Sequence, residues 1–303
     1  MCKIKLSKLV IRSIVVSDGK LTVAKEPILM LDSIVVMGNS QITEQAIRFA
    51  TANSVDIIHT DQNGHIIAVT NSFSNKKARL RLLQYKAYNE TMQRLGIAKL
   101  ICKRKLEAQE SYLKNRRSIQ FTERHVFRDY IEQLDDAKTV NELLGIEGAA
   151  ANFYFNKLNS FSLFSRRTRR PATDIINALM NLTYSLVQQR VSSTLVGKGF
   201  DLQIGYLHSI SGQRPSLALD FLELFRSQAD AFVVTATNRK EFTIKDFDMI
   251  ESNKGLYLSR EAFARFLKKF NESLVPELEI DKEANWLRGL LLESFVGFEE
   301  AEL

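Results

Sequence analysis

The stretch GFDLQIGYLHSISGQRPSLALDFLELFR, residues 199–226, decides how the second half of the chain folds. Its first part holds Gly212 and Pro215, which favour turns, and its second part has leucine and phenylalanine at helical spacing. We therefore predict a loop followed by a helix, with Ser216 as the N-cap of that helix. A turn at this place brings the helix back past His208 in the loop.

Two acidic residues stand on one face of this predicted helix. Asp220 and Glu223 are three positions apart, so their carboxylates are neighbours that repel each other unless a cation or a basic group lies between them. The alternative is a bland one, in which Asp220 interacts with the helix dipole, Glu223 is exposed, and His208 is a hydrogen-bonded core residue. From this segment alone, the two interpretations carry equal weight.

A third carboxylate lies in NELLGIEGAAANFYFNKL, residues 141–158, which has a helical pattern. Glu147 and Tyr154 are seven positions apart and fall on nearly the same helix face. The small residues around Glu147 allow another helix or a DNA backbone to approach closely. Taken alone, the motif favours an ordinary surface glutamate. Together, Glu147, His208, Asp220 and Glu223 offer oxygen and imidazole ligands of the kind that suit Mg²⁺ or Mn²⁺.

A fourth segment, RRTRRPATDIINALMNLTYSLV at residues 166–187, combines an arginine cluster with a helix. Guanidinium groups have the fork geometry that binds phosphate, and the cluster consists of Arg166, Arg167, Arg169 and Arg170. Asp174, Asn177 and Tyr184 lie near one face of the helix that follows. A helix cap and a helix–helix hydrogen bond explain Asp174 and Asn177 better than catalysis does.

The charge distribution favours a polyanionic partner. The 303-residue chain has a formal net charge of +7, and residues 76–117 hold 13 Lys and Arg against 3 acidic residues, which is 13 − 3 = +10. Residues 271–303 carry 9 acidic against 2 basic residues, which is 2 − 9 = −7. Nucleic-acid binding explains this asymmetry better than solvated faces of long helices, which is the alternative.

Several classes of function are disfavoured by the sequence. The apolar runs are much shorter than the roughly 20 residues that span a bilayer, so we expect a cytoplasmic protein without a membrane partner. The two cysteines, Cys2 and Cys102, are too few for a disulfide framework or a cysteine zinc site. Phosphate-loop, dinucleotide-binding and nucleophile-elbow motifs are absent from the sequence.

The pattern of hydrophobic residues predicts an α+β protein. Residues 1–75 are β-rich, with hairpin signals at Ser17-Asp18-Gly19 and Asn63-Gly64. SIVVMG, residues 33–38, has the pattern of a buried strand, and a helix capped by Thr43 follows it. From Lys77 onward the pattern is helical. We therefore predict a small N-terminal β domain at residues 1–75 and a larger all-α C-terminal catalytic domain at residues 76–303.

These segments together resemble the CRISPR-associated integrase family that acquires new spacers. The matching residues are Glu147-Gly148, Ala150 and Tyr154; Arg170-Pro171, Asp174, Asn177-Ala178-Leu179 and Tyr184; Gly199, Gly205-Tyr206-Leu207-His208; and Ser216-Leu217-Ala218-Leu219-Asp220, Glu223 and Phe225-Arg226. Their order and spacing fit, and the resemblance covers most of the chain.

The resemblance implies a homodimeric, divalent-metal-dependent DNA endonuclease and integrase. It implies double-stranded DNA as substrate and a small ferredoxin-like CRISPR-associated protein as partner. Glu147, His208 and Glu223 would bind Mg²⁺ or Mn²⁺, and Asp220 would be a catalytic carboxylate or one that supports the ligands. The alternatives are a casposon-type integrase of the same fold and a non-catalytic DNA-binding scaffold.

Overall fold

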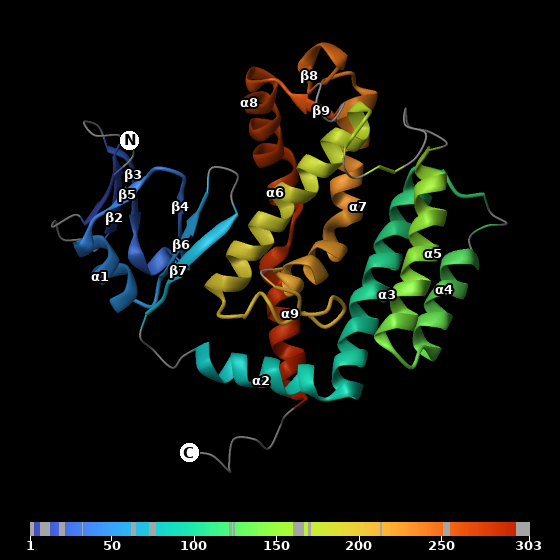
Figure 1. Ribbon diagram of the computed structural model, residues 1–303, viewed down its shortest axis with the longest axis horizontal. Coiled ribbons are helices and arrows are strands. Elements are labelled where there is room, and N and C mark those ends of the chain that lie inside the picture. The colour runs from blue at the N-terminus through green and yellow to red at the C-terminus, as the bar shows by residue number, and fades with distance from the viewer. Residues whose placement is uncertain are drawn as a thin grey trace. The chain divides into compact units, whose positions relative to one another are not determined.

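Strands dominate the chain up to Thr70 and helices dominate it from Ala78 onward (Figure 1). The protein's structure is a computed structural model that describes residues 3–6, 13–17, 22–31, 33–61, 65–72, 77–120, 123, 125–159, 167–168, 171–212, 214–250 and 255–294. The predicted fold class, a small β-rich part followed by a larger helical part, is confirmed.

The strands before Thr70 form two sheets. They are β1 (Lys3–Leu6), β2 (Ser13–Ser17), β3 (Thr22–Pro27), β4 (Ser33–Met37), β5 (Gln41–Ile42), β6 (Asp56–Thr60) and β7 (Ile66–Thr70). One sheet has the order β3-β2-β1-β5 and the other the order β4-β6-β7. The β2–β3 and β6–β7 pairs are antiparallel, as the two hairpin signals predict, although the turn residues Asp18-Gly19 and Asn63-Gly64 lie outside the described residues.

Helix α1 (Glu44–Ala52) packs beside these strands and closes their core. The Thr43 hydroxyl accepts a hydrogen bond from the Ala46 N–H at 3.3 Å, which confirms the predicted cap. Ala46 and Ala50 are fully buried, and their small side chains allow the helix to lie close to the core residue Ile57.

The prediction that SIVVMG is a buried strand is wrong in one respect. β4 does form, but Val35 is 44% exposed and Met37 is 51% exposed, while Val36 is buried. The reason is that only one face of β4, with Ile34 and Val36, packs against the hydrophobic core, while the alternate side chains Val35 and Met37 point to the other face. The fully buried strand is its neighbour β6, in which Ile57 and Ile58 have no exposed surface.

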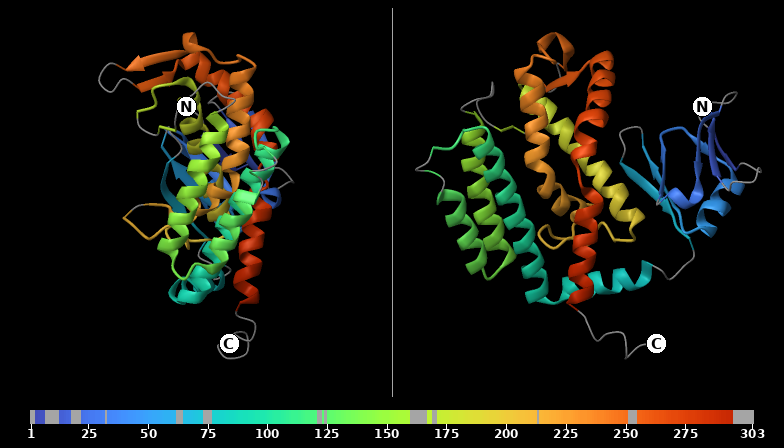
Figure 2. Two further views of the ribbon diagram at one scale, coloured as in Figure 1. Left: turned by 90° about the vertical axis from the view of Figure 1, so that its right-hand side faces the viewer. Right: turned by 180° about the vertical axis from the view of Figure 1, so that it is seen from behind.

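The remaining chain is built from helices. They are α2 (Ala78–Asn89), α3 (Thr91–Asn115), α4 (His125–Asp136), α5 (Val140–Asn159), α6 (Ile175–Gly197), α7 (Ser216–Asn238), α8 (Arg260–Lys269) and α9 (Ile280–Glu293), with short 3-10 or π turns at Ile244–Asp246, Phe270–Leu274 and Val275–Glu277. Another 3-10 turn, Ile28–Met30, lies between β3 and β4. Helix α3 packs against α4, α5 and α7, and Figure 2 shows α3, α4 and α5 side by side from two further directions. α3 is therefore the centre of this group of helices.

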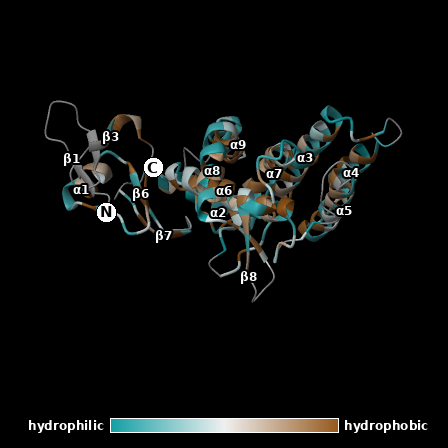
Figure 3. Ribbon diagram, turned by 90° about the horizontal axis from the view of Figure 1, so that it is seen from above, coloured by the Kyte–Doolittle hydropathy of each residue, from teal (hydrophilic) through white to brown (hydrophobic). Residues whose placement is uncertain are grey.

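Helix α4 of this group is amphipathic. In Figure 3 hydrophobic and hydrophilic residues alternate along α4. Phe127 and Leu134, seven positions apart on α4, are fully buried, whereas Glu132 and Asp135 between and beside them are exposed. None of the helices in the described part of the chain combines the length and the hydrophobicity that crossing a lipid bilayer requires.

The C-terminal part contains a strand pair that the sequence analysis did not predict. β8 (Phe247–Ile250) and β9 (Gly255–Leu258) pair in antiparallel fashion, so the region is mostly helical and the prediction of an all-α region is wrong in this detail. Each strand has four residues, which is too short for a period of two to stand out against the surrounding helical pattern.

The chain forms two compact units that differ from the predicted domains. One unit comprises residues 1–86, 189–202 and 280–303, and the other comprises residues 87–188 and 203–279. A compact unit is defined by contacts and a domain by independent folding. The domain boundary after residue 75 therefore stays a prediction.

Candidate active site

Three helices of the second compact unit bring two predicted metal-ligand carboxylates to one lysine. The Lys105 ammonium on α3 donates a hydrogen bond to Glu147 on α5 and forms an ion pair with Glu223 on α7. Lys105 is 3% exposed and Glu223 is 5% exposed. Because α3 packs against both α5 and α7, the convergence follows directly from the helix packing.

Charge neutralisation makes this buried cluster possible. Burial by itself lowers the pKa of Lys105, but the carboxylates of Glu223 and Glu147 more than offset this, so its pKa is raised. Burial would raise the pKa of Glu223, yet the positive charges of Arg226 and Lys105 hold it well below its usual range. Both groups are therefore ionised at neutral pH, and neither is placed to act as an acid or a base.

Arg226 completes the surroundings of Glu223. Its Nε donates to Glu223 Oε2 at 2.8 Å, one helical turn along α7, and its guanidinium lies 4.8 Å from the centre of the Tyr184 ring. The Nη groups of Arg226 make no hydrogen bond to any residue in the described ranges, and 20% of its side chain is exposed.

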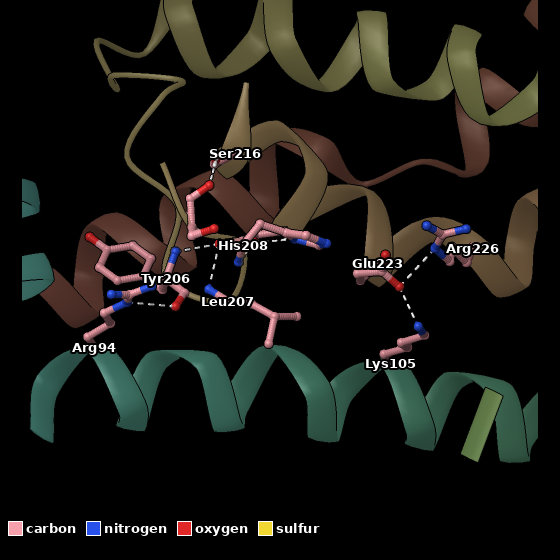
Figure 4. A network of polar contacts seen from close by, with 10 residues as sticks. Arg94, Lys105, Tyr206, Leu207, His208, Ser216, Glu223 and Arg226 are labelled. Carbon is pink, nitrogen blue, oxygen red and sulfur yellow. Dashed lines mark hydrogen bonds and ion pairs between the residues drawn. The ribbon is translucent and has the colours of Figure 1, made fainter. Parts of the chain in front are cut away.

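Asp220 on α7 binds the loop that carries His208, and Figure 4 shows Tyr206, Leu207 and His208 of this loop from close by. Asp220 is fully buried and accepts the backbone N–H groups of Tyr206, Leu207 and His208 at 2.5, 3.0 and 2.9 Å. It also lies 2.7 Å from Nδ1 of His208. A carboxylate accepts hydrogen bonds, so Nδ1 carries a proton, and in the neutral imidazole Nε2 is then the atom with the lone pair. Asp220 therefore positions His208.

Two further contacts fix the same loop. A Cβ atom on Gly205 would lie 2.7 Å from the backbone carbon of Ser216, so only glycine fits where the loop crosses the start of α7. Arg94 on α3 donates from Nε to the carbonyl oxygen of Tyr206 at 3.1 Å. The prediction that Ser216 is the N-cap is wrong, because Ser216 is the first helical residue and its hydroxyl donates instead to the Ser209 carbonyl oxygen at 2.8 Å.

The predicted tyrosines Tyr154 and Tyr184 meet at Asp230, a residue that the sequence analysis missed. Both hydroxyls donate to this fully buried carboxylate, from Tyr154 at 3.0 Å. Burial raises the pKa of Asp230 to about 6, although the hydrogen bonds from Tyr184 and Tyr154 oppose the rise. Asp230 lies seven positions after Glu223 on α7, a spacing that places the two acids on one helix face.

Asp174 has the capping role that the sequence favours, whereas Asn177 contacts Asp174 and the segment before α6. Asp174 accepts the Asn177 backbone N–H at 2.8 Å and its side-chain amide at 2.6 Å, next to the start of α6. Asn177 in turn accepts Arg167 Nη1 at 2.8 Å, and the Arg167 guanidinium lies 5.4 Å from the centre of the Tyr184 ring. Of the predicted phosphate-binding arginines, Arg167 is used in this network, whereas Arg166, Arg169 and Arg170 lie outside the described residues.

The basic stretch at residues 76–117 also has internal uses that charge counting cannot detect. Lys77 forms an ion pair with the buried Asp56 at 2.5 Å, and Lys99 donates to the Asp135 carbonyl oxygen at 2.6 Å. Arg116 and Arg117, at the end of α3, are exposed. Part of the basic stretch thus stabilises the fold and part remains at the surface.

The donor set fits a hard or borderline divalent ion, because it offers two carboxylates and an imidazole with a free Nε2. In the described part of the chain, however, no three His, Cys, Asp or Glu side chains are gathered closely enough to hold a metal ion. In this structure the Lys105 ammonium contacts both Glu147 and Glu223, the two carboxylates that would hold such an ion.

The sequence as a whole matches one protein family. The family model described as CRISPR associated protein Cas1 matches residues 6–272. The chain belongs to the Cas1 family. CRISPR-associated endonuclease Cas1 3 of Thermus thermophilus is 31% identical over 266 residues, which cover 86% of this chain and 79% of that relative. The resemblance drawn from the sequence is therefore confirmed.

Solved structures agree with this Cas1 assignment at the level of the fold. A partial Cas6-RT-Cas1–Cas2 complex has a TM-score of 0.76 and 20% identity, covering 97% of this chain and 93% of that chain. A casposase bound to an integration product has a TM-score of 0.71 and 23% identity, covering 97% of this chain and 89% of that chain.

Proposed function

We propose that this Cas1 protein is a divalent-metal-dependent DNA endonuclease and integrase that inserts short DNA segments into a CRISPR array. The observation that carries the proposal is the meeting of Glu147 and Glu223, from two helices, at one cation position on α3. The Thermus thermophilus relative, which is named an endonuclease, and the casposase, whose title names an integration product, support it.

Glu147, Glu223 and Nε2 of His208 would hold Mg²⁺ or Mn²⁺. When bound, such an ion polarises a phosphoryl oxygen and favours ionisation of an attacking hydroxyl. The chain contributes the orientation of its ligands: Asp220 fixes the tautomer and the direction of His208, and the packing of α5 and α7 on α3 fixes the carboxylates.

The proposed reaction is a phosphoryl transfer. The oxygen of a DNA 3′-hydroxyl loses its proton to water and forms a new bond to phosphorus. The bond to the former 3′ oxygen breaks, and that oxygen leaves with the cut strand and takes up a proton from water. The Nη groups of Arg226 would donate to the non-bridging oxygens of the phosphate. Such positioning and charge stabilisation account for most phosphoryl-transfer catalysis.

The partners belong to the same proposal. The chain would act as a homodimer in the cytoplasm on double-stranded DNA, with the small ferredoxin-like CRISPR-associated protein beside it. The Cas6-RT-Cas1–Cas2 complex, which has the same fold in its Cas1 part, supports such a partner. Exposed basic residues such as Arg116 and Arg117 would contact phosphates, which makes binding depend steeply on salt.

An integration assay tests the proposal. The protein is incubated with Mn²⁺, a labelled short duplex with 3′-hydroxyl ends and a supercoiled plasmid that carries a repeat array, with His208→Ala in parallel. We expect label to join the plasmid with the wild-type protein and EDTA or His208→Ala to abolish joining. Joining that persists in EDTA, or in His208→Ala, would contradict the proposal.

Two rival functions give different results in the same assay. A casposon-type integrase, favoured by the likeness to the casposase, would join long duplexes of defined end sequence in preference to short ones. A DNA-binding scaffold would bind the duplex without joining it, and adding the ferredoxin-like partner would not restore joining.

A further inference from the structure

Lys105 occupies a position that the proposed metal-dependent reaction gives to a metal ion. Its ammonium contacts one carboxylate from α5 and one from α7, and its side chain is 4% exposed. An isolated buried ammonium is strongly unfavourable, as is a pair of adjacent buried carboxylates, so each group makes the other tolerable. In this arrangement the Lys105 ammonium supplies the positive charge that offsets the two carboxylates.

The charges of this cluster are already balanced without a metal ion. Lys105 and Arg226 together balance Glu147 and Glu223. A divalent ion bound by the same carboxylates would give these four side chains and the ion a net charge of about +2. The ion and the Lys105 ammonium would then repel each other at short distance. Either the lysine side chain leaves or the ion stays out.

We propose that Lys105 is an internal competitor of the divalent ion, which holds Glu147 and Glu223 together in the metal-free protein and must withdraw its ammonium for the ion to bind. The inference rests on the proposed function, because it assigns these carboxylates to a metal. It also goes further, since it makes the affinity for metal depend on a residue that is not a ligand.

The exposure of the three side chains indicates where the exchange takes place. The Glu147 side chain is 20% exposed, against 4% for Lys105 and 6% for Glu223. The ion therefore enters, and the ammonium leaves, on the side of Glu147. The long, flexible lysine stem allows this movement while α3 keeps its place.

Replacing the lysine tests the competition directly. Lys105→Met keeps the length of the side chain and removes its charge. We expect calorimetric titration with Mn²⁺, in the absence of DNA, to show on the order of tenfold tighter binding or more than in wild type, because the carboxylates then lack any other cation between them. Lys114→Met on the same helix, which breaks the exposed pair of Lys114 with Glu110, should leave the affinity unchanged.

A double variant locates the ion. In Lys105→Met combined with Glu147→Gln, the gain in affinity should disappear, because one of the two carboxylates is gone. A gain that survives in the double variant places the ion elsewhere and overturns the inference.

A second measurement uses the wild-type protein and does not depend on whether a variant folds. Lysine side chains are labelled with an amine-reactive reagent and quantified by mass spectrometry with and without Mn²⁺. We expect Lys105 to be protected without the ion and to be labelled several-fold faster with it, while labelling of the exposed Lys114 stays constant. Persistent protection of Lys105 at saturating Mn²⁺ overturns the inference.

The outcomes separate this inference from the proposed function. If wild type and Lys105→Met bind Mn²⁺ at this site with equal affinity, the competition is wrong and the metal-dependent integrase stands. If neither protein binds Mn²⁺, and the wild type joins no DNA, both are wrong.

Discussion

Replacing Asp220 with asparagine removes the charge that holds the His208 loop on α7. The carboxylate accepts hydrogen bonds from the backbone of Tyr206, Leu207 and His208 and from Nδ1 of His208. Asparagine has one acceptor oxygen, and its amide nitrogen is a donor, so two of the four hydrogen bonds are lost. Hydrogen bonds to a charged group contribute about 1.5–3 kcal/mol each, so we expect the free energy of unfolding to fall by about 3–6 kcal/mol.

Equilibrium unfolding in urea, followed by circular dichroism, measures this loss from the shift of the midpoint. Asp248→Asn is the matched control, because Asp248 is exposed, and it should change the free energy by less than about 0.5 kcal/mol. The Mn²⁺ affinity of Asp220→Asn should fall as well, since His208 loses its orientation. A loss of stability below about 1 kcal/mol would refute the reasoning, because an ordinary substitution has that effect.

Further consequences concern the same region of the protein. His208→Ala should lower the rate of strand joining by about 100-fold or more while leaving duplex binding in a gel-shift assay nearly unchanged; a parallel loss of binding would contradict its assignment to the chemistry. Gly205→Ala should reduce stability by about 1–3 kcal/mol through the clash with Ser216, whereas Gly148→Ala, where a Cβ meets nothing within 4 Å, should raise it by up to about 1 kcal/mol in thermal unfolding. Because the pKa of Asp230 is raised to about 6 in the folded protein, the folded state holds this proton more tightly than the unfolded state, and stability falls as pH rises from about 4 to about 6. Asp230→Asn should remove this fall. Urea unfolding of both proteins at about pH 4 and about pH 7 measures it, and the same pH dependence in both would contradict the assignment of the fall to Asp230.

Local patterns were sufficient to predict much of the fold. The cap at Thr43, the β2–β3 and β6–β7 pairs, and the helices after Ala78 each follow from signals within a few residues of one another. The β8–β9 pair escaped because four-residue strands carry little periodic signal. The exposed face of β4 was not predicted, because which face of a strand is covered depends on elements that are distant in the sequence.

The candidate site divides in the same way. Glu147, His208 and Glu223 are visible in the sequence through their spacing and through the resemblance to a family, and their roles as metal ligands remain a proposal. Lys105 was counted with the surface charges of a basic stretch. It falls on the buried stripe of α3, near Ala98, Ile101, Cys102 and Gln109, which is the signal that could have set it apart. Its two carboxylate partners lie 42 and 118 positions further on, and no local pattern reports such a pairing.

Helix α3 sets the spacing between the two parts of the site. Arg94 contacts the His208 loop and Lys105 contacts the two carboxylates, so both parts of the site are positioned by the same helix. Arg94 and Lys105 are 11 positions apart, which corresponds to a rise of about 16 Å along the helix. One residue inserted between them would rotate the part of α3 beyond the insertion by about 100°. Lys105 would then point away from the two carboxylates, while Arg94 would keep its contact with the loop. A change in the number of residues between these two positions would therefore separate the loop from the carboxylates.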